Sequence, residues 1–148
     1  MSADQSTLIQ ATAIAIEGRA LMVEGEPGSG KSSLALALIE RGAQLIGDDG
    51  VQLTREGQAI IASPPPNITG KLEIWGVGIV ELPTVSAPLA LILSLADDAP
   101  RYREAAETRE ILGVAVPTLP FSPGTIAPAE RVLWALRTHG QIQGLAFG

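Results

Sequence analysis

The sequence contains no cysteine and a single histidine, His139, in 148 residues. The absence of cysteine excludes disulfide bonds and metal sites built on thiolates. A lone histidine excludes a metal centre that needs several imidazole ligands. Disulfide-stapled scaffolds and the common structural zinc sites are therefore ruled out as explanations of this chain.

Basic residues are also few, because ten Lys and Arg stand against sixteen Asp and Glu, giving a net charge of −6. A general nucleic-acid binder needs a basic surface to displace counterions, and this composition argues against one. No apolar run reaches membrane-spanning length, and no basic-then-apolar signal opens the chain. We therefore expect a cytoplasmic protein that binds neither nucleic acid nor membrane.

The chain has the composition of a globular protein, with 46% hydrophobic and 18% charged residues. Its length suits one domain over residues 1–148, and neither an internal repeat nor a linker divides it. Alternating and β-branched runs predict more strands than helices, which excludes a plain doubly wound sheet. The expected strands are 7–16, 20–24, 44–47, 51–53, 59–62, 87–95 and 114–119, and the expected helices are 33–41 and 128–138.

The connecting segments are read from their turn residues. Residues 17–19 are expected to turn the first strand back on the second as a hairpin, and 54–57 to do the same further on. The proline run at 63–67 predicts a stiff extended spacer. Glycines within 68–82 suggest close approach of the backbone to a ligand or to a second loop. The charged segment 97–110 is interpreted as a solvated loop or short helix.

The strongest signal is a phosphate-binding loop of the form G-x-x-x-x-G-K-S between an expected strand and an expected helix. Its glycines let backbone N–H groups close around phosphate oxygens, and the helix N-terminus faces the anion. Lys31 is suited to the β- and γ-phosphates, and the Ser32 hydroxyl to Mg²⁺. The predicted nucleotide-binding residues are Gly25, Glu26, Pro27, Gly28, Ser29, Gly30, Lys31 and Ser32.

Two adjacent acids, Asp48 and Asp49, follow the expected strand at 44–47. In α/β proteins the carboxyl ends of strands are where ligands and chemistry gather. A carboxylate held within hydrogen-bond reach of a serine hydroxyl serves as its general base. The pair beside the phosphate loop is therefore a candidate catalytic element.

The phosphate loop, the Leu-Ile-Gly-Asp-Asp run at 45–49 and the segment Leu-Glu-Ile-Trp-Gly-Val-Gly-Ile-Val at 72–80 occur together. In this combination the chain resembles the catalytic domain of HPr kinase/phosphorylase, the bifunctional serine kinase of the bacterial phosphotransferase system. The resemblance covers about residues 7–140, leaving 141–148 as a tail, and is close to the short proteobacterial form without the family's N-terminal domain. It implies an α/β phosphate-loop kinase domain of the HPr kinase/PEP carboxykinase-like type, β-rich with few helices.

The resemblance also implies roles for particular residues. Asp49 corresponds to the family's general base, and Lys31 to its phosphate-binding lysine. Ser32 and Glu73 correspond to the residues that hold Mg²⁺. The family's catalytic arginine falls on Arg101, with Arg103 as the alternative. Asp48 is expected to support the site, as a cap or through water.

The chain departs from the family pattern at four positions. Gln10 stands where the family usually has a histidine, and Trp75 replaces an arginine in the signature. The family's arginine-proline-glycine-arginine turn, which is linked to dephosphorylation, is represented by Ser122 to Thr125 without either arginine. These departures spare the ATP and Mg²⁺ residues and fall on residues used for regulation and for the reverse reaction.

The expected function is therefore an ATP- and Mg²⁺-dependent serine kinase of HPr or a related phosphocarrier, with weak or absent phosphorylase activity. A nucleotide-binding regulatory pseudokinase is one alternative. A kinase of a different peptide or of a small molecule is another. The family often forms hexamers, and the resemblance leaves homo-oligomer formation open.

Overall fold

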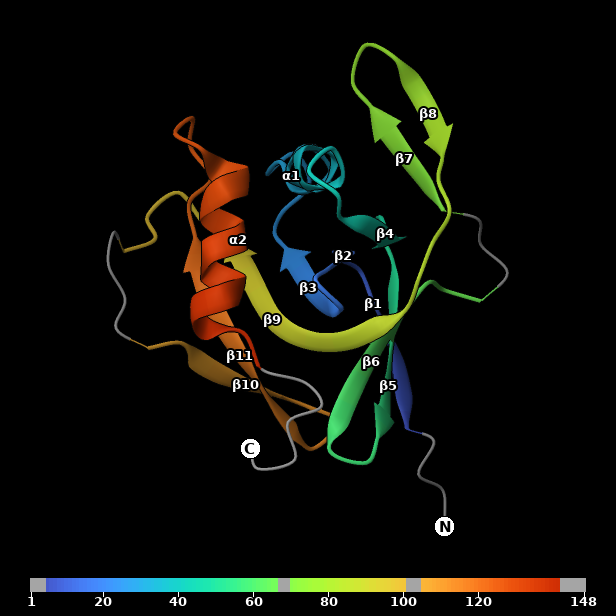
Figure 1. Ribbon diagram of the computed structural model, residues 1–148, viewed down its shortest axis with the longest axis vertical. Coiled ribbons are helices and arrows are strands. Elements are labelled where there is room, and N and C mark those ends of the chain that lie inside the picture. The colour runs from blue at the N-terminus through green and yellow to red at the C-terminus, as the bar shows by residue number, and fades with distance from the viewer. Residues whose placement is uncertain (1–4, 67–69, 101–104, 142–148) are drawn as a thin grey trace.

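The structure is a computed structural model that describes residues 5–66, 70–100 and 105–141 (Figure 1). Within these residues strands predominate, and two helices accompany them. The strands are β1 (Ser6–Ile9), β2 (Thr12–Ile16), β3 (Arg19–Glu24), β4 (Gln44–Gly47), β5 (Val51–Glu56), β6 (Ala59–Ser63), β7 (Lys71–Ile74), β8 (Gly78–Glu81), β9 (Ala87–Leu95), β10 (Glu107–Ile111) and β11 (Val114–Phe121). The helices are α1 (Lys31–Ile39) and α2 (Pro128–His139).

Strand direction brings the sequence motifs to one edge of the sheet. β3 pairs with β9 in parallel, and β9 pairs with β11 in parallel. β2 is antiparallel to both β3 and β4, so β4 runs in the same direction as β3. The carboxyl ends of β3 and β4 therefore lie at the same edge, where the segments 25–30 and 48–49 leave the sheet.

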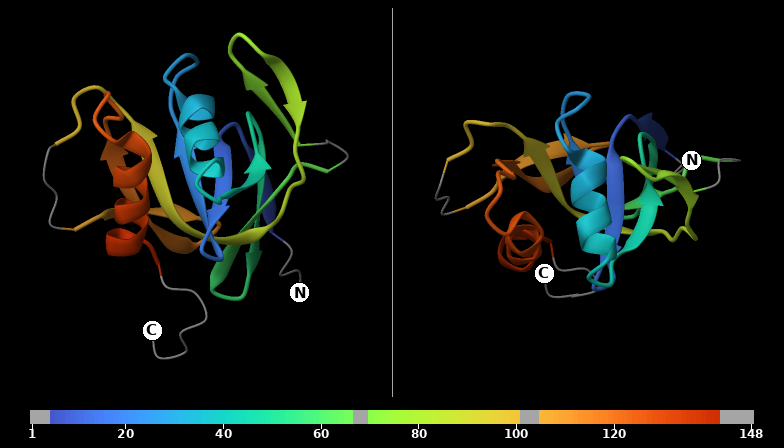
Figure 2. Two further views of the ribbon diagram at one scale, coloured as in Figure 1. Left: turned by 45° about the horizontal axis from the view of Figure 1, so that its top comes forward. Right: turned by 90° about the horizontal axis from the view of Figure 1, so that it is seen from above.

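The long strand β9 curves through the middle of the fold (Figures 1 and 2), and it contributes side chains to two hydrophobic cores. From Leu91 onward the side chains of β9 alternate, so Leu91 and Leu93 face one core and Ile92 faces the other. Leu89 also faces the second core, because the pairing of β9 with β3 shifts its register between Leu89 and Leu91. The first core lies under α1 and α2, which pack side by side on that face of the sheet. The second core lies between the opposite face and the strands β5 and β6. Both ends of the phosphate-loop segment are thereby anchored in a packed interior.

The expected strand at 7–16 is two strands, which corrects the sequence prediction. β1 pairs with β5, whereas β2 pairs with β3 and β4. The chain bends at Gln10 and Ala11 as it passes from one sheet partner to the other. A run of β-branched residues has the same sequence pattern whichever strand it pairs with, so the pattern could not predict that 7–16 changes its partner strand. The expected hairpin turn at 17–19 is confirmed by the pairing of Ile16 with Arg19.

The expectation of a loop or short helix over 97–110 is wrong at its end, because Glu107–Ile111 is the strand β10. It pairs antiparallel with β11 through a two-residue turn in which Leu112 and Gly113 both have positive φ. That geometry matches the right-handed twist of a hairpin. The guanidinium of Arg55 donates to the Leu112 carbonyl at 3.0 Å and holds this turn from outside.

The glycine-rich segment 68–82 contains the two-stranded hairpin β7–β8, which stands apart from the main sheet (Figure 1). Gly76 and Gly78 have φ of 80° and 130°, values that side chains with a Cβ rarely adopt, so they serve the turn. A Cβ on Gly70 would come within 2.6 Å of the Leu82 carbonyl oxygen. The close approach found here joins the two ends of one hairpin, and the expected approach to a ligand or to a second loop stays a prediction.

The helices follow the sequence prediction with small shifts. α1 begins at Lys31 rather than 33 and ends at Ile39, after which Gly42 and Ala43 donate to the carbonyls of Ile39 and Leu38. α2 spans Pro128–His139 and buries Ala129, Val132 and Leu136 against the first core. In the part of the chain that the structure describes, neither helix is long and apolar enough to cross a membrane.

Candidate functional site

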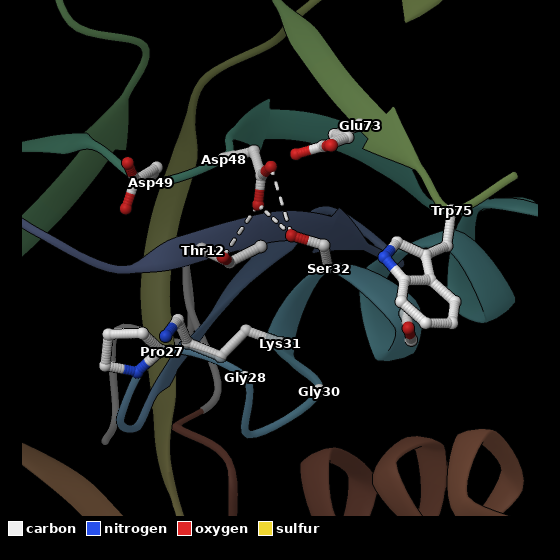
Figure 3. A pocket seen from close by; sticks show the side chains of 11 residues that line it. Thr12, Pro27, Gly28, Gly30, Lys31, Ser32, Asp48, Asp49, Glu73 and Trp75 are labelled. Atoms are coloured by element: carbon white, nitrogen blue, oxygen red, sulfur yellow. Dashed lines mark hydrogen bonds between the residues drawn. The ribbon is translucent and has the colours of Figure 1, made fainter. Parts of the chain in front are cut away.

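A cavity of about 590 Å³ lies at the edge where β3 and β4 end (Figure 3). Its walls come from β2, the phosphate loop, α1, the segment after β4 and the β7–β8 hairpin. The side chains and backbone that line it belong to Thr12, Pro27, Gly28, Gly30, Lys31, Ser32, Ser33, Asp48, Asp49, Glu73 and Trp75. Residues separated by more than 60 positions thus face one space.

The phosphate loop forms one wall of this cavity. Gly30 has φ of 102° and directly precedes α1, and the Leu34 N–H donates to its carbonyl at 3.0 Å. The first residues of α1, 31–33, line the cavity, so the helix begins at its wall, where the helix dipole favours an anion. The Lys31 ammonium donates to the carbonyls of Gly25 (2.7 Å) and Glu26 (3.3 Å). Among the described residues no carboxylate forms an ion pair with Lys31, so its charge is free to meet phosphate.

Asp48 is the acidic residue that is tied into the fold. Its Oδ1 accepts hydrogen bonds from the Ser32 hydroxyl at 2.8 Å and from the Thr12 hydroxyl at 2.9 Å. Ser32 also approaches Oδ2 at 3.1 Å. Asp48 therefore connects the start of α1 to the start of β2, and its carboxylate orientation is fixed from two sides (Figure 3).

Asp49 is exposed and points away from Asp48 (Figure 3). Its φ of 66° lies in the left-handed region, which costs energy for a residue with a side chain and is common at functional sites. The amide of Gln10 lies 3.4 Å from its Oδ1. Asp49 thus makes fewer internal hydrogen bonds than Asp48, and its carboxylate is the more accessible of the two from the cavity.

The β7–β8 hairpin supplies the opposite wall through Glu73 and Trp75. The Glu73 carboxylate is directed toward Asp48 and Ser32 (Figure 3). Leu72, the neighbour of Glu73, is fully buried, and β7 contacts α1, so the hairpin is anchored by its other face. The Trp75 side chain is 95% exposed at the hairpin turn.

The base of the phosphate loop is braced from the far side of the sheet. The Arg109 guanidinium on β10 donates to both carboxylate oxygens of Glu24, one of them at 2.8 Å, and Ser94 donates at 3.0 Å. The hydrogen bonds from Arg109 hold the pKa of Glu24 below its ordinary value, against the opposing effect of burial. Glu24 directly precedes Gly25, so this half-buried ion pair fixes where the loop begins.

The structure gathers most of the predicted site residues but not all of them. Gly25, Glu26 and Ser29 do not line the cavity, and Glu26 and Ser29 border a neighbouring hollow that Pro123 also lines. Arg101 and Arg103 lie outside the described residues. Sequence reasoning missed Thr12, whose signal was a single hydroxyl within an otherwise apolar strand.

The turn at 122–125, where the family has two arginines, is held by other contacts. The Ser122 hydroxyl donates to the Ala96 carbonyl and accepts from the Ala99 N–H at 3.1 Å. The Arg131 guanidinium donates to the carbonyls of Ser122 and Pro123 at 2.6 and 2.8 Å. Arg131 is therefore engaged with the backbone of this turn, away from the cavity that holds Lys31.

The fold and this cavity define an α/β protein with a phosphate-loop sequence, in which acidic residues after β4 and on a separate hairpin face the loop. Comparison with known proteins gives the family. The family model of the HPr serine kinase C-terminal domain matches residues 2–88. The chain therefore belongs to the HPr serine kinase C-terminal domain family.

Relatives and a solved structure agree with this assignment. The chain is 31% identical over 134 residues to an HPr kinase/phosphorylase of Exiguobacterium sp., and the match covers 80% of this chain and 43% of the relative. It is 32% identical over 133 residues to that of Clostridium tetani, covering 80% and 44%. This chain thus spans under half the length of these relatives. The structure of the HPr(Ser) kinase/phosphatase from Coxiella burnetii matches with a TM-score of 0.76 and 30% identity, over 88% of this chain and 90% of that one.

Proposed function

We propose that this protein is an ATP- and Mg²⁺-dependent serine kinase that phosphorylates HPr or a related phosphocarrier. The observation that carries the proposal is the single cavity in which Lys31 and Ser32 of the phosphate loop face Asp49 and Glu73. A nucleotide-binding site alone needs only the loop. A kinase also needs a base beside the phosphoryl group and a carboxylate for the metal, and this cavity has candidates for both.

Each of these residues has a chemical task in phosphoryl transfer. The loop N–H groups and the Lys31 ammonium bind and orient the phosphates of ATP. The Asp49 carboxylate takes the proton of the acceptor serine as its oxygen attacks the γ-phosphorus and the bond to the β-phosphate breaks. The transferred group ends on the serine oxygen, and ADP leaves.

The donor set fits Mg²⁺ bound together with the nucleotide. Ser32 and Glu73 offer hard oxygen ligands, which this ion prefers, and Asp48 supports the site by accepting from Ser32. Within the described residues no group of three or more His, Cys, Asp or Glu side chains is placed to hold a metal unaided. That agrees with the usual arrangement, in which one or two carboxylates act with substrate phosphates and water. When bound, the ion neutralises charge on the transferring phosphoryl group.

We further propose that the reverse reaction, removal of phosphate from phosphoserine by inorganic phosphate, is weak or absent. In that reaction inorganic phosphate must approach the phosphate of phosphoserine, and cationic groups are needed to offset the repulsion between the two anions. Trp75 at the cavity and Gln10 beside Asp49 offer no positive charge, and the turn at 122–125 carries no arginine. The forward reaction is less affected, since its attacking hydroxyl is neutral and Lys31 and Mg²⁺ offset the charge of ATP.

The function and its direction are tested with one purified system. We expect labelled phosphate to pass from the γ-position of ATP to the HPr of the same genome, and not to HPr whose acceptor serine is replaced by alanine. The phosphoserine product, incubated with enzyme, Mg²⁺ and millimolar phosphate, is expected to release little pyrophosphate. Nucleotide binding without transfer to any acceptor would instead support the regulatory pseudokinase. Release as fast as the forward reaction would contradict the proposed direction.

Replacing Glu73 by Gln is expected to raise the Mg²⁺ concentration needed for half-maximal activity, because an amide is a weaker ligand for this ion than a carboxylate. The maximal rate at saturating Mg²⁺ should be affected less. The measurement is initial rate against Mg²⁺ at fixed ATP. Glu81→Gln is the matched control, since Glu81 lies on the same hairpin, pairs with Lys71 in the register and does not line the cavity. An unchanged Mg²⁺ requirement in Glu73→Gln would make Glu73 a structural residue.

A further inference from the structure

Thr12 is a polar side chain in an otherwise apolar interior. It is 1% exposed, and it is the only buried polar or charged residue in the part of the chain that the structure describes. It begins β2 between the ends of two strands, with Val23 of β3 as its registered partner and Ala13 beside it paired with Gly47 of β4. A buried hydroxyl is costly unless it is hydrogen-bonded. Its position therefore requires a specific partner.

That partner is the carboxylate of Asp48, to which the Thr12 hydroxyl donates at 2.9 Å. The same Oδ1 accepts from the Ser32 hydroxyl at 2.8 Å. If the Asp48 carboxylate accepted a hydrogen bond only from Ser32, rotation of the Asp48 side chain could change the direction of that hydrogen bond. The second donor, fixed on a buried strand, removes this freedom. Thr12 thus sets the orientation that Asp48 presents to Ser32.

The orientation of the Ser32 hydroxyl follows from this contact. Because its hydrogen is donated to Asp48, the oxygen lone pairs are turned away from Asp48. Ser32 lines the cavity, so those lone pairs are available to a cation there. Hydroxyl oxygens bind divalent cations through lone pairs, and partners that orient a ligand contribute strongly to metal affinity.

We propose that Thr12 is a positioning residue for the divalent cation that enters with the nucleotide. Through Asp48 it orients the Ser32 oxygen toward that cation, without touching the cation or the substrate itself. This inference rests on the proposed function, since it presumes that the cavity takes a nucleotide together with Mg²⁺. It adds a residue from β2 to a site otherwise built from the phosphate loop, β4 and the hairpin.

Two substitutions separate the hydroxyl of Thr12 from its packing. Thr12→Val keeps the branched shape and removes the donor, whereas Thr12→Ser keeps the donor and removes the methyl group. We expect Thr12→Val to raise the Mg²⁺ concentration for half-maximal nucleotide binding by up to roughly 10-fold, the lower end of the cost of losing a direct partner of a metal ligand, because Thr12 acts on Ser32 through Asp48. Thr12→Ser is expected to stay close to the unchanged protein.

The measurement is binding of a fluorescent ADP analogue, titrated with Mg²⁺ in the absence of any acceptor, so turnover does not enter. Affinity for the analogue without Mg²⁺ should be the same in all variants. Combining Thr12→Val with Asp48→Asn should add little to the effect of Asp48→Asn alone, because both act through one carboxylate. Thermal unfolding of each variant shows whether it is folded at the assay temperature.

The outcomes distinguish the inference from the proposed function. If the unchanged protein binds the analogue in a Mg²⁺-dependent way and Thr12→Val does the same, the inference alone is overturned. It is also overturned if Thr12→Ser loses as much as Thr12→Val, since packing then explains the effect. If Thr12→Val does not fold, Thr12→Cys replaces it, because the cysteine thiol is a weaker hydrogen-bond donor and is similar in size to serine. An unchanged Mg²⁺ requirement in Thr12→Cys would then overturn the inference. Absence of Mg²⁺-dependent binding in the unchanged protein overturns both.

Discussion

Replacing Asp49 by Asn is expected to lower the turnover of phosphoryl transfer by about 10²-fold or more, the usual contribution of a general base. Asparagine keeps the shape of the side chain and cannot take the serine proton. Affinity for ATP should remain near normal, because the loop and Lys31 supply the phosphate contacts. The measurement is the rate at saturating ATP, Mg²⁺ and acceptor, with nucleotide affinity measured separately.

Asp48→Asn is the matched control, since it removes the same charge one residue away. Asp48 accepts hydrogen bonds from Thr12 and Ser32, whereas Asp49 is exposed in the cavity with the Gln10 amide beside it. We therefore expect Asp48→Asn to change mainly the Mg²⁺ requirement, and Asp49→Asn to change the rate at saturating Mg²⁺. If Asp48→Asn lost its turnover and Asp49→Asn remained fully active, the general base would be Asp48 and not Asp49.

The contrast between these two acids shows what the sequence could and could not predict. Strand, glycine loop and helix are encoded within a short window, so the phosphate loop and α1 were predictable to within two residues. That Asp48 and Asp49 lie beside the loop depends on the direction of β4, which is set by its pairing with β2. The hydrogen bond between Thr12 and Asp48 joins residues 36 positions apart, and no local pattern reports it.

The failures of prediction have the same origin. The strand at 7–16 was expected to be continuous because its residues are uniformly suited to a sheet, yet it changes partners at Gln10. Strand β10 was missed because it is short and charged, and only its pairing with β11 makes it a strand. Glu73 was predicted from a resemblance, and its carboxylate is found at the cavity because β7, in which Leu72 is buried, packs against α1. Its role as a metal ligand stays a prediction, as does the role of Arg101.

Lys31→Ala is the second substitution with a large expected effect. A hydrogen bond to a charged group contributes about 1.5–3 kcal/mol, which corresponds to roughly 10- to 100-fold in affinity for the Mg²⁺–nucleotide complex. The lysine also stabilises charge on the transferring phosphoryl group, so transfer is expected to fall further than binding. Binding of a fluorescent nucleotide and the transfer assay measure the two losses separately.

The fold should survive this substitution, because the Lys31 ammonium makes only exposed hydrogen bonds to the carbonyls of Gly25 and Glu26. Lys71→Ala is the matched control. The sequence has only these two lysines, so either substitution changes the net charge equally, and Lys71 is exposed on the hairpin outside the cavity. Lys71 lines a neighbouring hollow with Asp48 and Asp49, so the control is read in nucleotide binding. Lys71→Ala is expected to bind nucleotide normally, which separates the local effect of Lys31 from the loss of one charge. Unchanged nucleotide affinity and turnover in a folded Lys31→Ala protein would rule out the phosphate-binding role of the loop, and with it the proposed kinase.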